Sequence, residues 1–164
     1  MLRYYPNYFY NSLTPIDTSS KKVIRLSVET DSHTFVTLYQ KDARLFDESY
    51  IYSYFRVSIA RVSDSNIEYV SLKCECKRNI VFEKFLTAGE YIILIEPIWY
   101  IPNPVGFTIS TYSSSFVFLS EMQDVATSQF NRMELLIWKS YCESNPTKLV
   151  EKYNSKIVEA DFSM

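Results

Sequence analysis

The stretch Lys-Val-Ile-Arg-Leu-Ser-Val-Glu at residues 22–29 alternates apolar and polar side chains. Ile24, Leu26 and Val28 fall on one face of an extended chain, and polar side chains fall on the other. A period of two residues is typical of a strand that buries one face, whereas an amphipathic helix repeats every three or four residues. The stretch therefore predicts a half-buried strand, which turn-forming residues at 30–33 bring to an end.

The same pattern recurs downstream between further turn-forming segments. In the long strand expected at 50–62, Phe55, Val57 and Ile59 should point inward. Residues 97–104 are too rich in proline for a central strand. About eight short strands at this spacing predict an all-β antiparallel sandwich. The other strands are expected at residues 34–40, 68–77, 79–85, 90–95, 107–112 and 116–119.

The composition supports a folded domain and excludes several kinds of site. Hydrophobic residues make up 47% of the 164 residues, and 16% are aromatic, which favours strands. The two glycines, Gly89 and Gly106, cannot form a glycine-rich phosphate-binding loop. A net charge of −2 gives no general attraction to nucleic acid, so we expect no nucleic-acid partner.

The cysteine count and the apolar stretches bear on location. An odd number of cysteines, with a start at residues 1–13 that resembles no secretory signal, indicates a reducing compartment. The longest apolar stretch, residues 91–101, is too short to span a bilayer. We predict a cytoplasmic protein that is neither secreted nor transmembrane. The abundance of Tyr, Asn, Ile and Lys hints at an AT-rich genome and a protist source.

Different patterns precede and follow the predicted strands. Residues 1–21 are expected to form an extended N-terminal arm, residues 22–120 the sandwich, and residues 121–164 a helical C-terminal extension. Thr127 or Ser128 could cap a helix that runs to about residue 142. Asn145 and Pro146 would end it and begin a short second helix through residue 153. The main apolar stripe of the first helix consists of Phe130, Met133, Ile137 and Tyr141.

One hairpin carries a family resemblance. The stretch Phe-Glu-Lys-Phe-Leu-Thr-Ala-Gly-Glu-Tyr-Ile-Ile at residues 82–93, followed by Pro97, Gly106 and Phe107, resembles the β-sandwich domain III of calpains, which is C2-like. The resemblance covers roughly residues 22–119. Independently of it, Gly89 suits a positive φ in a tight turn, and Tyr91 can fill the core while its hydroxyl reaches a polar edge.

The protease activity of calpains does not carry over, and we expect no enzyme. Cysteine protease chemistry needs a thiolate activated by a nearby imidazole. The single histidine, His33, is expected in the turn at 30–33, and no catalytic motif precedes the cysteines. We predict no catalytic residues.

Metal binding has two candidates. Cys74 and Cys76 share one strand face, where we expect buried core thiols rather than zinc ligands, because zinc wants four ligands. Asp42, Asp47 and Glu48 supply carboxylates for calcium in a loop comparable to the acidic loop of calpains. Lys41 and Arg44 interrupt that loop and would repel a cation, so a solvated loop is the favoured alternative and no cofactor is expected.

Two segments are candidates for partner contacts. Trp99, Tyr100 and Ile101 place bulky apolar groups in a loop, where they would either fold back over the sandwich or bind a partner. Leu135 lies across the expected helix from its stripe, and Trp138 extends the apolar surface to one flank. A helix that is apolar on more than one side indicates contacts beyond the sandwich.

The sequence therefore favours a non-catalytic protein-interaction module. We expect a structural or adaptor subunit of a larger assembly, with a cytoskeletal or ciliary setting as one candidate and other proteins as partners. The alternatives are a calcium- and phospholipid-responsive C2-like domain, which would contact a membrane, and a regulatory partner of a calpain-like protease.

Overall fold

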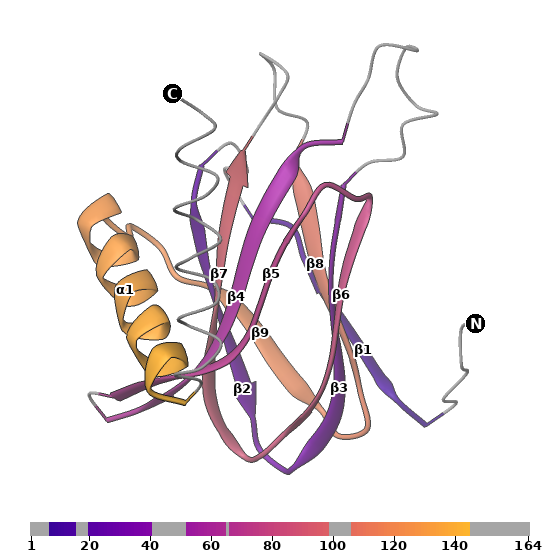
Figure 1. Ribbon diagram of the computed structural model, residues 1–164. Helices are drawn as coiled ribbons and strands as arrows, with labels where there is room; N and C mark the ends of the chain where they lie inside the picture. Colours follow the sequence, from indigo (N-terminus) through magenta and orange to yellow (C-terminus); the bar gives the residue numbers. More distant parts are fainter. Residues whose placement is uncertain (1–6, 16–19, 41–51, 65, 99–105, 145–164) are drawn as a thin grey trace.

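The chain folds into two antiparallel sheets that face each other, with one helix against the larger sheet (Figure 1). The computed structural model describes residues 7–15, 20–40, 52–64, 66–98 and 106–144. The all-β antiparallel sandwich predicted from the sequence is therefore confirmed. The elements are β1 (Phe9–Leu13), β2 (Lys22–Val28), β3 (Ser32–Gln40), β4 (Tyr54–Ser63), β5 (Asn66–Glu75), β6 (Asn79–Leu86), β7 (Gly89–Ile98), β8 (Phe107–Ser113), β9 (Val117–Glu121) and α1 (Thr127–Ser144).

The described chain has one strand more than the sequence predicted. The four-stranded sheet has the order β1-β8-β3-β6, and the five-stranded sheet has the order β5-β4-β7-β2-β9. The additional strand, β1, lies within the stretch 1–21 that was predicted to be an arm. It pairs with β8 from Phe9 opposite Ser113 to Leu13 opposite Ile109. Its backbone groups thus obtain their hydrogen bonds from the sheet rather than from water alone.

The main core lies between the sheets and contains the inward rows that the alternation predicted. Ile24 and Leu26 of β2 are fully buried there, as are Phe55, Val57 and Ile59 of β4. Burial of each such side chain stabilises the fold by about 1.5–3 kcal/mol.

Strand β7 is buried on both faces. Tyr91, Ile93 and Ile95 belong to the core between the sheets. The two residues between them, Ile92 and Leu94, belong to a second apolar cluster beneath α1. A strand that is covered on both faces requires a continuous apolar run rather than an alternating one, and this strand supplies one.

Pro97 and Ile98 belong to β7, so the prediction that residues 97–104 are not part of a central strand is wrong for these two residues, while residues 99–104 lie outside the described part of the chain. Pro97 pairs with Phe55 of β4. The pairing of β7 with β2 has already ended at Ile95, opposite Lys22. Among the described strands, therefore, β7 is paired only with β4 at Pro97, and the ring nitrogen can face the other side without loss of a ladder hydrogen bond.

Helix α1 begins one residue earlier than predicted. Ala126, rather than Thr127 or Ser128, occupies the N-cap position, because its carbonyl accepts the first helical hydrogen bond, from Phe130 N, at 3.0 Å. Gln129 Oε1 accepts from Ala126 N at 3.0 Å, which is one half of a capping box. The side chain three residues into the helix thus supplies the capping interaction.

The predicted stripe of α1 docks the helix on the five-stranded sheet. Phe130, Ile137 and Tyr141 are buried against it. Arg56 of β4 donates to Glu134 at 2.5 Å and lies 3.8 Å from Glu96 of β7, so an ion-pair network also joins helix and sheet. Burial lowers the pKa of Arg56, but its hydrogen bond to Glu134 and the charges of Glu96 and Glu134 outweigh burial, so the pKa lies above its usual value.

The outer edge of β5 is covered in two ways. Ser140 of α1 accepts a hydrogen bond from the backbone N–H of Tyr69 at 2.8 Å. The pairing of β5 with β4 shifts between Ile59 and Ala60, and Val70 is the extra residue of the resulting bulge. Both features keep another strand from adding to this edge.

The prediction of buried thiols in β5 is wrong. Beyond the bulge, Lys73 lies opposite inward-pointing Val57, so the neighbouring Cys74 points outward and is exposed. Lys73 itself lies over the ring of Phe82. Cys76 is half-buried and donates to the carbonyl of Tyr52. The bulge shifts the register by one residue. The residues beyond it, Cys74 among them, therefore point to the face opposite to the one that simple alternation predicts.

The turn between β6 and β7 has the form expected from its glycine. Gly89 has a φ of +152°, and the hydroxyl of Tyr91 donates to the carbonyl of Thr87 at 2.7 Å. Arg61 of β4 donates to the carbonyl of Ala88 at 2.9 Å and so holds the turn from the other side. A Cβ on Gly89 would lie only 2.8 Å from a guanidinium nitrogen of Arg61.

We therefore expect Gly89→Ala to lower the free energy of unfolding by about 1–3 kcal/mol, since it combines an unfavourable φ with displacement of Arg61. Chemical denaturation of the two proteins measures the difference. Ala88→Ser, next to it in the same turn, is the control and should change stability by less than about 0.5 kcal/mol. Equal effects of the two substitutions would contradict this account of the turn.

Candidate interaction surface

The outer face of the four-stranded sheet is rich in aromatic residues and nearly free of charge. Strand alternation and the pairing of β1, β8, β3 and β6 define which side chains point outward. Helix α1 packs on β4 and β5 of the opposite sheet. Together with Tyr8, which precedes β1, the outward residues form what we call the aromatic face: Tyr8, Tyr10, Ser12, His33, Phe35, Thr37, Tyr39, Asn79, Val81, Glu83, Phe85, Thr108, Ser110 and Tyr112.

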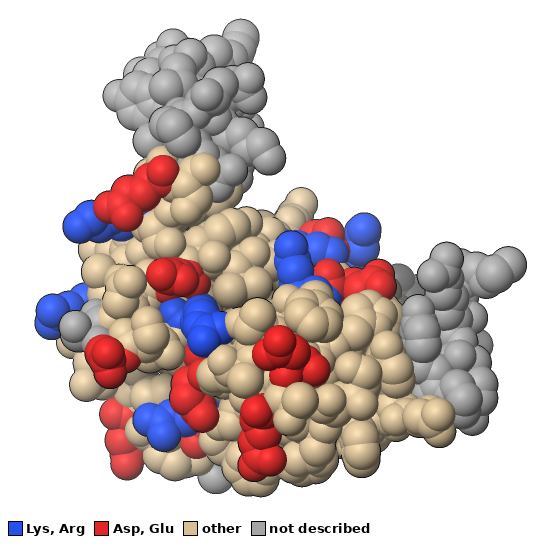
Figure 2. Space-filling model, turned by 90° about the horizontal axis from the view of Figure 1, so that it is seen from below, with Lys and Arg blue, Asp and Glu red and all other residues tan. Residues whose placement is uncertain are grey.

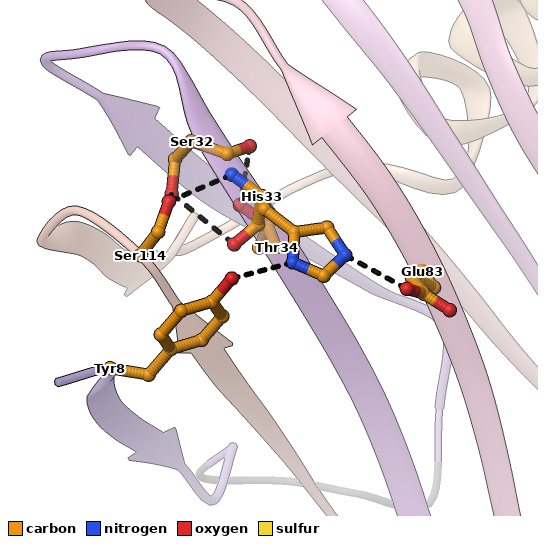
Figure 3. Close-up of polar contacts among 6 residues, drawn as sticks. All are labelled: Tyr8, Ser32, His33, Thr34, Glu83 and Ser114. Carbon is orange, nitrogen blue, oxygen red and sulfur yellow. Dashed lines mark hydrogen bonds and ion pairs between the residues drawn. The ribbon is translucent and has the colours of Figure 1, made fainter. Parts of the chain in front are cut away.

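A chain of hydrogen bonds crosses the centre of this face (Figure 3). Tyr8 Oη lies 2.7 Å from His33 Nδ1, and His33 Nε2 lies 2.8 Å from Glu83 Oε1. An ionised carboxylate can only accept, so Nε2 carries a proton. In a neutral imidazole Nδ1 then accepts from the phenol of Tyr8. The three side chains come from three separate segments of the chain and fix the orientation of the imidazole ring.

Ring contacts extend this chain into a continuous cluster. The ring of Tyr8 is 5.2 Å from that of Tyr112, and the ring of His33 is 4.9 Å from that of Phe35. Tilted and edge-on aromatic pairs at such distances contribute about 0.5–1.5 kcal/mol each beyond their buried area. The cluster thus joins the segment before β1 to β8 and β3 as one ordered surface.

His33 is a strand residue, which corrects the prediction that it lies in a turn. Its backbone N–H donates to Ser114 Oγ at 3.0 Å (Figure 3). Its carbonyl accepts from Ser114 N, also at 3.0 Å. On the other side it lies opposite Phe85 of β6. These partners extend β3 back to Ser32, and alternation then turns the imidazole onto the aromatic face.

A second polar pair lies at the β1 end of the face. A hydrogen bond with Tyr10 is the main cause that raises the pKa of Tyr39 above its usual value, and burial and the charge of Tyr10 act in the same direction. The pair joins β1 to β3 across the strand between them.

The rims of the face are open to solvent. Tyr10 on β1 is 64% exposed, and Phe85 on β6 is 66% exposed. The side chain of Glu83 is 58% exposed although it is hydrogen-bonded to His33. Large apolar groups at two opposite edges of one ordered surface are typical of a surface that another molecule covers.

The sequence-based candidates fall elsewhere. Leu135 is 69% exposed on α1, as expected for a residue opposite the buried stripe. Trp138 is half-buried, with its ring 5.9 Å from that of Tyr141, so part of its surface is used within the molecule. Contact of either residue with a partner stays a prediction. The other candidates, Trp99, Tyr100, Ile101, Asp42, Asp47 and Glu48, lie outside the described residues.

Sequence reasoning missed the aromatic face, although a signal was present. In β3 the aromatic residues Phe35 and Tyr39 of one row alternate with Val36 and Leu38 of the other, so large apolar side chains occur on both faces of the strand. Tyr8 and Tyr10 had been assigned to an unpaired arm, so their proximity to this row was not expected. The pairing of β1 with β8 shows that these two tyrosines lie on the same face as the outward row of β3.

The opposite side of the sandwich has a cavity beside α1. It measures about 580 Å³, and its lining includes the apolar side chains of Met122 and Met133 as well as Arg25 and Glu90. Figure 2 views the end of the sandwich from below and shows acidic and basic side chains interspersed, without a large area of one sign.

Two further observations concern metals and membranes. Within the part of the chain that the structure describes, no three His, Cys, Asp or Glu side chains come together in a way that could hold a metal ion. Among the same residues, no helix combines the length and the apolar character that crossing a membrane requires.

Comparison with known proteins gives no functional assignment. The sequence matches no protein-family model and no curated protein. Among solved structures, a mitogen derived from Yersinia pseudotuberculosis is similar with a TM-score of 0.36 and 13% identity over 76% of this chain and 94% of that one. A protein from Sulfurospirillum deleyianum gives a TM-score of 0.40 and 12% identity over 71% and 99%. The resemblance to calpain domain III stays an expectation from the sequence.

We expect Tyr10→Phe to lower the pKa of Tyr39 toward its usual value of about 10, because the variant removes the hydrogen bond. Titration by NMR of ring-labelled tyrosine measures it. Tyr69 is an internal control, because burial is the main cause that raises its pKa, and this should persist. An unchanged pKa of Tyr39 would contradict the assignment.

The sign of the linked effect on folding follows from the same shift. The folded protein holds the Tyr39 proton more tightly than the unfolded chain does. The stabilisation is therefore complete below a pH of about 10 and is lost as the pH rises through the higher pKa of the folded state. In Tyr10→Phe this part of the decline in stability at alkaline pH should be smaller.

Proposed function

We propose that the chain is a non-catalytic protein-interaction module that docks a partner on its aromatic face. The observation that carries the proposal is the composition of that face, where aromatic residues are abundant and Glu83 and His33 are the only titratable groups apart from tyrosine. The centres of protein interfaces are enriched in aromatic residues and depleted of charge in the same way. Tyrosine in particular supplies large contact area at low entropic cost.

The chemistry of the face favours a protein over a nucleic acid. Binding to nucleic acid gains most of its affinity from Lys and Arg that neutralise phosphates. The outward positions that define the face contain neither residue, and they include one carboxylate. A nucleic acid could stack on the rings, but the charge would oppose it.

The hydrogen-bonded chain is better suited to hold the surface in shape than to perform catalysis. Tyr8, His33 and Glu83 follow the order of an acid–base relay. The phenol at the end of the relay, however, packs against the ring of Tyr112. The 580 Å³ cavity lies on the other sheet. The chain of bonds therefore orders the rings, and an ordered surface binds with less loss of entropy.

A second contact point favours the role of a structural or adaptor subunit. Leu135 is exposed on α1, which covers the five-stranded sheet, whereas the aromatic face lies on the four-stranded sheet. Figure 1 shows the helix and β1 on opposite sides of the sandwich. A module with apolar contact points on two sides can bridge two components of an assembly.

Affinity purification from the native cells tests the function. The tagged full chain should retain stoichiometric partners that the double variant Tyr10→Ser, Phe85→Ser loses, because truncation of an aromatic hot-spot residue costs about 2 kcal/mol or more of binding free energy. Phe118→Ser on β9 is the control, since Phe118 is similarly exposed and lies on the other sheet. All three residues are exposed, so thermal unfolding should change little.

The absence of any stoichiometric partner of the wild-type protein would contradict the proposal. Equal retention by the double variant and the control would contradict it as well, because the partner would then bind elsewhere.

A further inference from the structure

The carboxylate of Glu83, on the aromatic face, accepts a hydrogen bond through only one of its two oxygens within the described part of the molecule. Glu83 Oε1 accepts from His33 at 2.8 Å. Its other oxygen, Oε2, accepts no hydrogen bond from the described residues, and Figure 3 shows it pointing away from the imidazole ring. The side chain is 58% exposed. A carboxylate that is oriented by one hydrogen bond can accept a second one, through its other oxygen, from a donor on a partner.

The surroundings of Glu83 are aromatic. In the register of the sheet, Phe35 of β3 lies directly opposite Glu83, and His33 lies opposite Phe85. Phe85 is two residues further along β6, hence on the same face, and is largely exposed. The adjacent Lys84 falls in the alternate row, opposite buried Thr34. No basic side chain of the face therefore competes for Glu83.

This arrangement limits what can cover the face. A purely apolar partner would bury Oε2 of Glu83 without a hydrogen-bond donor, which costs about 1–3 kcal/mol or more. An acidic partner would be repelled. A cation, in contrast, gains both the carboxylate and the negative ring faces of the neighbouring aromatic residues.

We propose that the aromatic face binds a protein segment carrying an arginine, whose guanidinium donates to Glu83 and lies against the ring of Phe85. The proposal rests on the interaction function proposed above and names the chemistry of its partner. Arginine is favoured over lysine because a planar, weakly hydrated guanidinium can stack on a ring and bond a carboxylate at once. His33 holds Glu83 in place before binding, which reduces the entropy lost on complex formation.

Peptide libraries with one fixed position test the proposal. Nine-residue peptides of otherwise random sequence carry arginine, lysine, citrulline, leucine or glutamate at the centre, and their binding to the labelled full chain is measured. The arginine pool should bind at least about tenfold more tightly than the citrulline pool, which has the same shape without the charge. The glutamate pool should bind weakest.

Variants locate the effect. Glu83→Gln keeps an acceptor for His33 and should reduce the preference for arginine over citrulline to less than about threefold, because the charge is lost. Glu68→Gln on β5 of the other sheet makes the same chemical change at an exposed site and should leave the preference intact. Equal preferences in the two variants would overturn the assignment of Glu83.

The failures of the two proposals are distinguishable. If the leucine and citrulline pools bind as tightly as the arginine pool, and Tyr10→Ser, Phe85→Ser abolishes all binding, the arginine inference fails and the aromatic face remains the docking surface. If the double variant binds every pool as the wild-type protein does, both proposals fail. Binding of no pool by the wild-type protein would overturn the arginine inference.

Discussion

Burial of β7 on both faces is the constraint on which the other parts of the structure depend. Its inner side chains close the core against the four-stranded sheet, and its outer side chains require a second cover, which α1 supplies. The buried stripe of α1 docks the helix there, and the ion pair between Arg56 and Glu134 also joins it to β4. Since α1 packs on β4 and β5, it does not cover the outer face of the other sheet.

Because α1 covers only the five-stranded sheet, the outer faces of the two sheets differ in composition. The face beneath α1 is aliphatic, with Ile92 and Leu94 at its centre, because a helix with an apolar stripe packs well on branched side chains. The aromatic face has no helix among the described residues and instead orders itself through ring contacts and through the bonds of His33 to Tyr8 and Glu83. A surface stabilised in this way is ready to bind without first rearranging.

Sequence periodicity predicted the sandwich, the inward rows of β2 and β4, the turn at Gly89 and the stripe of α1, because each depends on residues close together in the chain. It failed where a distant pairing set the outcome. The bulge at Val70 turned Cys74 outward, and the pairing with β8 made a strand of residues expected to form an arm. The aromatic face was not predicted for the same reason: Tyr8 and His33 are 25 residues apart in the sequence, so periodicity within a single strand could not bring them together.

The covered edge of β5 has a consequence for self-association. A free edge strand offers a row of unpaired amides to any extended chain, and this is the usual start of fibre formation. Here Ser140 occupies the amide of Tyr69, the bulge distorts the row, and the charge of Lys73 lies on the inward row beyond it. The helix that completes the second apolar cluster therefore also obstructs strand addition at this edge, so its detachment would expose the edge of β5 along with apolar surface.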